Sequence, residues 1–277
     1  MDGNLQFVDN SPRLAYKIVG EGPPVVFLHG IGGRRQNWQA QMNALESQFT
    51  CIAWDARGYG DSEDYDGALD FCHFADDLVR LLDDVSIERA HLVGLSMGAR
   101  ILLDFHSRYD MRVASLTLCD CFYGFKAALS PEKQAEYIEL RERPLREGKT
   151  FADLAPKLIA SLVSPNCPEP IKDDLLQSIL ALRKESYLKT LRASVTFDRG
   201  SELANITQPV QLIYGEQDQL TPPSIGEDMK DQLANARLSI LAGAGHLSNL
   251  EKPEEFNETL VQFLNQHASL ATFSKDV

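Results

Sequence analysis

The stretch HLVGLSMGAR, residues 91–100, places one serine between two glycines at the end of an apolar run. The run Ala90–Val93 predicts a buried strand, and Met97–Tyr109 predicts a helix because its apolar residues recur at helical spacing. The serine therefore falls at the joint between a strand and a helix, where the chain has only a few residues in which to turn.

A sharp turn at Ser96 suits a serine nucleophile. A serine hydroxyl attacks a carbonyl only when a base takes its proton and preorganised donors stabilise the oxyanion that forms. The turn lifts the hydroxyl above the sheet edge and points the helix N-terminus at the reacting carbonyl. Such a turn leaves no space for side chains two residues away on either side, which accounts for Gly94 and Gly98. We therefore predict that Ser96 is the nucleophile.

Partners for this serine follow later strands of the chain. Asp218 comes after the apolar run VQLIYG, and His246 comes after the run RLSIL. The order nucleophile, acid, histidine is typical of a triad built around a serine at a strand–turn–helix joint. Asp120 also ends a predicted strand, in SLTLCD, and is an alternative acid. Asp218 is favoured because Gly215 supplies a turn ahead of it.

The sequence FLHGIGG, residues 27–33, directly follows the first strand that we expect to be parallel. Around such a serine, one oxyanion-hole amide belongs to the residue after the nucleophile and the other belongs to this loop. We assign the two donors to the backbone N–H groups of Met97 and Ile31. His29 lies in the same loop, and we expect it to shape the loop by hydrogen bonding rather than to act as a base.

Apolar strands and amphipathic helices alternate along much of the chain. After an antiparallel pair within residues 5–20, strands are expected at 24–28, 51–54, 90–93, 113–119, 210–214 and 237–241, and helices at 36–48, 73–84, 97–109 and from Pro253. This alternation implies a parallel sheet covered by helices on both faces. Ser224 and Glu227 fit a capping box at the start of another helix.

Residues 122–204 interrupt this alternation, because they contain helix signals only. We expect an α/β core made of residues 1–121 and 205–267, into which residues 122–204 are inserted as a helical lid. Residues 268–277 are expected to form a C-terminal tail that is frayed from about Ala268.

Taken together, the motifs resemble the α/β-hydrolase superfamily over residues 5–267. The segment WDARGYGDS, residues 54–62, is similar to a motif that this family commonly has after its fourth strand. The segments GLSMG, GEQDQLTPP and GAGHLSNLEKPEEF look most like the branch of 3-oxoadipate enol-lactonases and carboxylesterases. The resemblance implies an α/β-hydrolase fold, with a mostly parallel sheet flanked by helices and an inserted helical lid. It also implies a serine hydrolase that cleaves a small ester or lactone through an acyl-enzyme, with no cofactor and no metal.

Two other functions stay open. A carbon–carbon bond hydrolase of the same fold would use the same triad, and product analysis on a vinylogous diketone would distinguish it. Some proteins with this fold and triad are small-molecule receptors, for which a ligand would raise the melting temperature strongly while turnover stays very slow. Epoxide hydrolases and haloalkane dehalogenases are disfavoured, because they need an aspartate where this chain has Ser96.

The composition of the 277-residue chain limits the classes of binding partner and the cellular compartment that we expect. A formal net charge of −13 argues against nucleic acid or an anionic membrane as a general partner. The five cysteines are odd in number and lack metal-ligand spacing, so we expect reduced thiols in a cytoplasmic protein. The first residues lack the features of a signal peptide, and no apolar run is long enough to span a membrane. The sequence carries no signal for an oligomeric state.

Charge is distributed unevenly along the chain. Residues 122–200 hold 13 Lys or Arg and 11 Asp or Glu, whereas the rest of the chain is strongly acidic. A near-neutral lid over an acidic body favours a carboxylate-bearing substrate that meets a cation of the lid. The candidate cations are Arg141, Arg143, Arg146 and Arg192, although the first three fit the solvated face of a helix equally well.

Overall fold

The computed structural model describes residues 5–124 and 130–274, and its strands form a mostly parallel sheet. The strands are β1 (Leu5–Val8), β2 (Leu14–Val19), β3 (Pro24–Leu28), β4 (Thr50–Trp54), β5 (Ile87–Leu95), β6 (Val113–Cys119), β7 (Val210–Gly215), β8 (Ala236–Leu241) and β9 (Thr272–Phe273). Their order is β1-β2-β4-β3-β5-β6-β7-β8, and β9 pairs with β5. The pairs β1/β2 and β2/β4 are antiparallel, whereas the pairs from β4 across to β8 are parallel.

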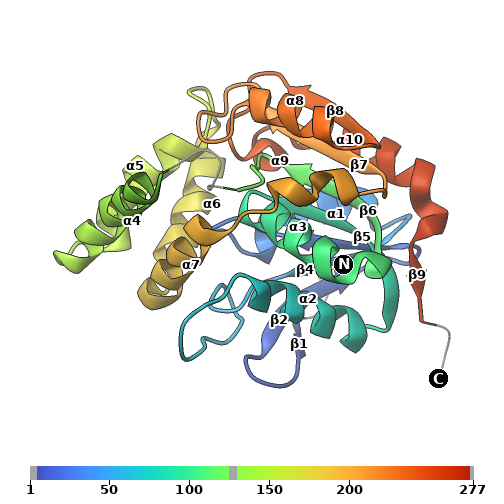
Figure 1. Cartoon of the computed structure of the whole chain (residues 1–277), viewed down its shortest axis with the longest axis horizontal. Helices are drawn as coiled ribbons and strands as arrows, with labels where there is room; N and C mark the ends of the chain where they lie inside the picture. The colour runs from blue at the N-terminus through green and yellow to red at the C-terminus, as the bar shows by residue number, and fades with distance from the viewer. Residues whose placement is uncertain (1–4, 125–129, 275–277) are drawn as a thin grey trace.

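Helices cover both faces of this sheet, as the alternation predicts (Figure 1). Along β3, Val26 packs in one apolar cluster and Phe27 packs in a second, because successive side chains of a strand point to opposite faces. The helices of the first cluster are α2 (Cys72–Asp84), α3 (Met97–Tyr109) and α8 (Pro223–Gln232), and those of the second are α1 (Gln39–Leu45) and α10 (Pro253–His267). The central strands are buried throughout, which explains their continuous apolar runs.

Four helices fill the described chain between β6 and β7. They are α4 (Pro131–Arg146), α5 (Phe151–Leu162), α6 (Glu169–Leu180) and α7 (Lys184–Thr196), and they lie together beside the sheet in Figure 1. The Arg183 guanidinium, at the start of α7, donates to the carbonyls of Ser62 and Gly60 at 2.7 and 3.0 Å. The inserted helices are thus tied to the loop that follows β4. Residues 125–129 of the predicted lid lie outside the described residues.

Two helix starts differ from the sequence predictions. The helix expected over 36–48 begins as a 3-10 turn, Arg35–Trp38, and continues as the shorter α1. The capping box expected at Ser224 is wrong, because α8 begins one residue earlier, at Pro223, without a side-chain cap. Proline has no N–H to satisfy and its fixed φ suits the first helical position, so Pro223 starts this helix without a cap.

The frayed C-terminal tail is also a wrong prediction for the residues that the structure describes. After a 3-10 turn over 268–270, β9 pairs antiparallel with β5, with Phe273 opposite Ile87. The reason is that β5 begins at Ile87, three residues before the predicted start at Ala90, so its first backbone groups need partners. Residues 275–277 lie outside the described residues. Across residues 5–124 and 130–274, no helix is both long and apolar enough to cross a membrane.

Candidate active site

The carboxyl ends of the parallel strands gather the predicted site residues at one edge of the sheet. His29 follows β3 and Ser96 follows β5. Asp120 follows β6, Asp218 lies three residues beyond β7, and His246 lies five residues beyond β8. Open α/β sheets bind ligands at this edge, because loops that leave neighbouring strands meet there.

Ser96 occupies the turn between β5 and α3 in an unusual backbone conformation. Its φ is +52° and its ψ is −109°, a region that residues other than glycine rarely adopt. Its own N–H donates to the Cys119 carbonyl on β6 at 2.8 Å, which holds the turn against the sheet. A strained residue at the end of a central strand is a common mark of a functional position. The turn also leaves the hydroxyl at the N-terminus of α3.

The glycines on either side of Ser96 have the steric role that the sequence predicts. A Cβ atom at Gly94 would lie 2.5 Å from the backbone nitrogen of Ala99. A Cβ atom at Gly98 would lie 2.1 Å from the carbonyl oxygen of Leu28. Both distances are far below van der Waals contact with backbone atoms, which cannot move aside as a flexible side chain would. The two glycines therefore let α3 approach β3 and β5 closely enough to form the turn.

Gly98→Ala is expected to lower the free energy of unfolding by about 1–3 kcal/mol or more, the usual range for a side chain forced into a packed interior. It should also reduce activity, because relief of the clash displaces the turn at Ser96. A matched control is Gly67→Ala, since φ at Gly67 is +77° but a Cβ there meets nothing within 4 Å. Thermal melts and activity assays of both variants test this expectation, and equal losses in the two would contradict the steric interpretation.

His246 and Asp218 are in direct contact. Nδ1 of His246 lies 2.8 Å from Oδ2 of Asp218, and both side chains are almost fully buried. The other oxygen of Asp218 accepts the backbone N–H groups of Leu220 and Thr221 at 2.8 and 3.1 Å. The Thr221 hydroxyl also donates to Asp218. Two backbone N–H groups and one hydroxyl therefore fix the Asp218 carboxylate, and its Oδ2 contacts the imidazole.

The contact between Asp218 and His246 lowers the pKa of the acid and raises that of the imidazole. Burial raises the pKa of Asp218, but the hydrogen bonds from His246 and Thr221 outweigh it and leave the pKa below its ordinary value of 3.8. Burial lowers the pKa of His246, but the hydrogen bond to Asp218 and its charge outweigh that effect and raise the pKa above 6.5. Asp218 is therefore ionised at neutral pH, and the imidazole accepts a proton more readily than a free histidine does.

The His246 loop is fastened to the inserted helices. The His246 N–H donates to the Leu162 carbonyl, at the end of α5, at 2.9 Å. The Glu251 carboxylate accepts the backbone N–H groups of Gly245 and Ser164, both at 2.9 Å. The position of the histidine therefore depends on the segment that follows α5 as well as on the sheet.

Asp120, the alternative acid, is hydrogen-bonded to Gly215 and Ser248. Its carboxylate accepts the backbone N–H of Gly215 at 2.8 Å and the hydroxyl of Ser248, two residues beyond His246. The pKa of Asp120 is raised to about 7, mainly by burial; the charge of His246 opposes this rise and the charge of Asp218 adds to it. Asp120 thus links the ends of β6 and β7 to the histidine loop, while Asp218 contacts the imidazole itself.

The two predicted oxyanion donors belong to two segments that lie next to Ser96. Met97 is the first residue of α3, so its N–H has no carbonyl four residues earlier within the helix. Ile31 belongs to the loop after β3, and this loop passes close to the serine, since a Cβ at Gly30 would lie 3.3 Å from the Ser96 Cβ. Ile31 also lines the cavity described below.

His29 shapes the loop, in agreement with the expectation. Its Nε2 accepts the backbone N–H of Ala56 at 3.0 Å, so its Nδ1 carries the proton and donates to the Gly30 carbonyl at 2.8 Å. Burial lowers the pKa of His29, which keeps the ring neutral. Both ring nitrogens are occupied, and His29 therefore fastens the loop after β3 to the loop after β4.

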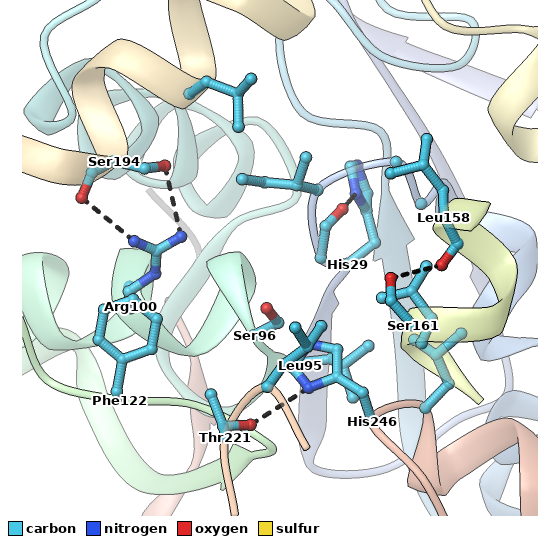
Figure 2. A pocket seen from close by; sticks show the side chains of 18 of the residues that line it. His29, Leu95, Ser96, Arg100, Phe122, Leu158, Ser161, Ser194, Thr221 and His246 are labelled. Carbon is cyan, nitrogen blue, oxygen red and sulfur yellow. Dashed lines mark hydrogen bonds between the residues drawn. The ribbon is translucent and has the colours of Figure 1, made fainter. Parts of the chain in front are cut away.

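Ser96 and His246 line one cavity of about 590 Å³ between the sheet edge and the inserted helices (Figure 2). Its apolar lining from α5, α6 and α7 includes Leu158, Leu162, Leu175, Ile179, Tyr187 and Leu191. The volume lies within the range of pockets that bind small molecules. Ser96 and His246 thus line a mostly apolar cavity whose outer wall is made by residues of the insertion.

Comparison with known proteins identifies the family. The family model for the alpha/beta hydrolase fold matches residues 23–253. This chain belongs to the α/β-hydrolase family. The match includes the turn at Ser96 and the loops that carry Asp218 and His246.

Relatives of this α/β hydrolase include esterases and lactonases. It is 29% identical to an AB hydrolase superfamily protein of Bacillus subtilis, over 89% of this chain and 93% of the relative. It is 26% identical to 3-oxoadipate enol-lactonase 1 of Acinetobacter baylyi, over 87% and 88%. A solved, malate-bound thermophilic esterase from Thermogutta terrifontis is 28% identical with a TM-score of 0.86, covering 96% of this chain and 99% of that one.

Sequence reasoning missed two polar residues of the site in this α/β hydrolase. Thr221 contacts both Asp218 and His246, with its Oγ1 3.2 Å from His246 Nδ1. Arg100 lines the cavity although it lies on α3. Its spacing could have identified it, because a residue four positions after Ser96 on a helix lies on the same face.

Proposed function

We propose that this α/β hydrolase is a carboxylic ester hydrolase, which cleaves a small ester or lactone through an acyl-enzyme. The observation that carries the proposal is the contact of His246 with Asp218 at a cavity that His246 shares with the strained Ser96. A serine, an imidazole and an ionised acid in this relation are the parts that acyl transfer needs. The esterase and lactonase relatives support the same reaction class.

In the proposed mechanism, Ser96 Oγ attacks the substrate carbonyl while Nε2 of His246 takes the hydroxyl proton. The amides of Met97 and Ile31 donate to the oxyanion that forms, and Asp218 stabilises the charged imidazolium. The carbon–oxygen bond to the alcohol then breaks, and His246 transfers its proton to the leaving oxygen. Water next attacks the acyl-enzyme, with His246 as its base, to release the carboxylic acid and restore Ser96.

The inserted helices are proposed to act as a lid. In this division, residues 1–121 and 205–267 form the core, residues 122–204 form the lid and residues 268–277 form the tail. The apolar side chains of α5, α6 and α7 set the length and width of the substrate, because they form the outer wall of the cavity. The T. terrifontis esterase was solved with malate bound, so a protein of this fold and 28% identical sequence binds a small, polar molecule.

A panel of 4-nitrophenyl esters and small lactones tests the proposed function directly. We expect turnover of short acyl chains, with a decline once the chain exceeds what the cavity of about 590 Å³ can hold. A vinylogous diketone included in the panel reports carbon–carbon bond cleavage. Cleavage of the diketone without cleavage of any ester or lactone would contradict the proposal.

The pH dependence of kcat/KM follows from the charges around His246. A general base must be unprotonated in the free enzyme, so activity falls as the pH drops through the pKa of His246. Burial and the charge of Arg100 lower this pKa, but the hydrogen bond to Asp218 and the charges of Asp218 and Asp120 raise it more, so the acid limb should lie above pH 6.5. Initial rates on a neutral ester from about pH 4 to 9 measure the limb. A flat profile down to about pH 4 would remove His246 from the mechanism.

A further inference from the structure

Arg100 is a buried arginine that lacks an acid partner. It is 3% exposed, yet among the residues that the structure describes no carboxylate forms an ion pair with it. Other largely buried arginines of the protein do have such partners, because Arg35 pairs with Asp55 and Arg57 pairs with Asp77. A guanidinium without a counter-charge in the protein interior costs folding free energy, so it suggests a functional reason for its position.

The contacts of Arg100 leave much of its hydrogen-bonding capacity unused. Its two terminal nitrogens donate to the carbonyl and the hydroxyl of Ser194, both at 3.3 Å, which is long for such bonds. Its buried Nε has no hydrogen-bond partner among the described residues. The ring of Phe122 lies 4.8 Å from the guanidinium carbon and attracts the cation without using an N–H. Burial lowers the pKa of Arg100 to about 10, so the group remains charged at neutral pH.

The guanidinium belongs to the cavity of the reacting serine. Arg100 lies four residues after Ser96, and helical side chains lean toward the helix N-terminus. Figure 2 draws Ser96 between the Arg100 guanidinium and the His246 ring. The charge of Arg100 also lowers the pKa of His246. Asp228 also lines the cavity, but its carboxylate accepts the Tyr123 hydroxyl and forms no ion pair with Arg100.

The arginines that the sequence offered for this task are placed differently. Three of them do not line the cavity and instead lie near acids of the insertion: Arg143, Arg146 and Arg192. Arg141 does line the cavity, but its guanidinium carbon lies 3.4 Å from the centre of the Tyr137 ring and it donates to the Tyr137 carbonyl. The expectation of a cation from the lid is therefore wrong for Arg143, Arg146 and Arg192. Arg100 of the core is the buried arginine that lines the cavity of Ser96.

We infer that Arg100 binds a carboxylate carried by the acyl part of the substrate. A guanidinium presents paired N–H groups that match the two oxygens of a carboxylate. A substrate carboxylate would supply the missing counter-charge and accept the unused donors. This inference rests on the proposed ester hydrolysis and narrows its substrates to esters or lactones whose short acyl chain ends in a carboxylate.

The position of Arg100 relative to Ser96 indicates that the carboxylate belongs to the acyl part of the substrate rather than to the alcohol part. His246 transfers its proton to the leaving oxygen, so the alcohol part departs on the histidine side. In Figure 2, the guanidinium lies on the other side of Ser96 from the imidazole. The retained acyl chain therefore extends toward Arg100, and its terminal carboxylate reaches the guanidinium.

A pair of isosteric esters tests the inference. Monoethyl glutarate carries a carboxylate where ethyl 5-methylhexanoate carries an isopropyl group of the same shape, and acid release in a pH-stat follows both. We expect the wild type to prefer the glutarate ester. Arg100→Met should lower the ratio of the two kcat/KM values about 10- to 100-fold, the range for a charge-assisted hydrogen bond. The matched control, Arg143→Met, removes an exposed arginine and should leave the ratio unchanged.

Stability measurements separate a binding role from a structural one. Without ligand, Arg100→Met should melt at or above the wild-type temperature, because it removes a buried charge that has no acid partner. Glutarate should raise the melting temperature of the wild type and not that of the variant. A large drop in melting temperature of the unliganded variant, with an unchanged ester ratio, would make Arg100 a structural residue and overturn the inference. Should Arg100→Met fail to fold, Arg100→Lys retains the charge and loses the paired donors, and an unchanged ratio in it would equally overturn the inference.

The outcomes distinguish the two proposals. If the wild type cleaves the neutral ester as fast as or faster than the glutarate ester, the Arg100 inference fails while ester hydrolysis stands. If neither ester nor any member of the wider ester and lactone panel is cleaved, the proposed function itself fails. A preference for 4-acetoxybutanoate, which carries its carboxylate on the alcohol part, with none for the glutarate ester would overturn the placement of the acyl chain.

Discussion

Ser96→Ala is expected to lose about 10³-fold or more of its ester hydrolysis while the protein remains folded. The variant removes the oxygen that attacks the carbonyl, so no acyl-enzyme can form. The fold should persist because the Ser96 backbone, whose N–H donates to the Cys119 carbonyl, makes the contact that holds the turn. Alanine at φ +52° retains the strain of the native serine, and the melting temperature should therefore change little.

A fluorophosphonate probe identifies the nucleophile without a substrate. Such probes bond to activated serines, and mass spectrometry of the labelled wild type should place the probe on Ser96. A matched control is Ser107→Ala, on the same helix, whose hydroxyl only donates to the Asp104 carbonyl. This variant should keep both labelling and activity. Labelling of another serine, or a Ser96→Ala variant that keeps most of its activity, would contradict the assignment.

Local steric and chemical constraints explain why the strands and the serine turn could be predicted. Buried parallel strands are apolar throughout, so their positions appear directly in the sequence. Gly94 and Gly98 mark a turn in which a Cβ would collide with backbone atoms, and no other residue fits there. The chain order of Ser96, Asp218 and His246 then reflects the order of three strands that share one sheet edge. Each of these features is encoded within a few residues.

Features that depend on distant partners could not be predicted in the same way. The pairing of β9 with β5 places Phe273 opposite Ile87. No local pattern in the last residues shows that the unpaired start of β5 is available to them. Likewise, Glu251 holds the histidine loop through the backbone of Ser164, in the insertion. Such contacts depend on where the folded chain brings two segments together.

Arg100 illustrates the same limit at the site. On a helix that begins at a predicted nucleophile, an arginine resembles an ordinary solvated side chain, because arginine is usually exposed. Its burial arises from packing against Phe122, at the start of the insertion, and from Ser194 on α7. The uneven distribution of charge along the sequence led to the prediction of a cation at the site, but the three-dimensional packing decides which arginine lies there.

Asp218→Asn is expected to lower kcat/KM by about 10⁴-fold with little change in stability. The native carboxylate accepts the proton of His246 Nδ1, which leaves Nε2 free to take the serine proton. An asparagine that presents its NH₂ group to Nδ1 would force the opposite tautomer, with the proton on Nε2. The variant would also lose the negative charge that stabilises the imidazolium. Its Oδ1 can still accept the N–H groups of Leu220 and Thr221, so the loop should stay in place.

Asp120→Asn is the matched comparison, because Asp120 also ends a strand at the same edge and is buried. It contacts Gly215 and Ser248 rather than the imidazole, so this variant should keep much of its rate. It should nevertheless shift the acid limb of kcat/KM to lower pH, since the charge of Asp120 raises the pKa of His246. The kinetics of both variants over the same pH range decide between the two acids. A nearly inactive Asp120→Asn beside an active Asp218→Asn would assign the acid of the triad to Asp120.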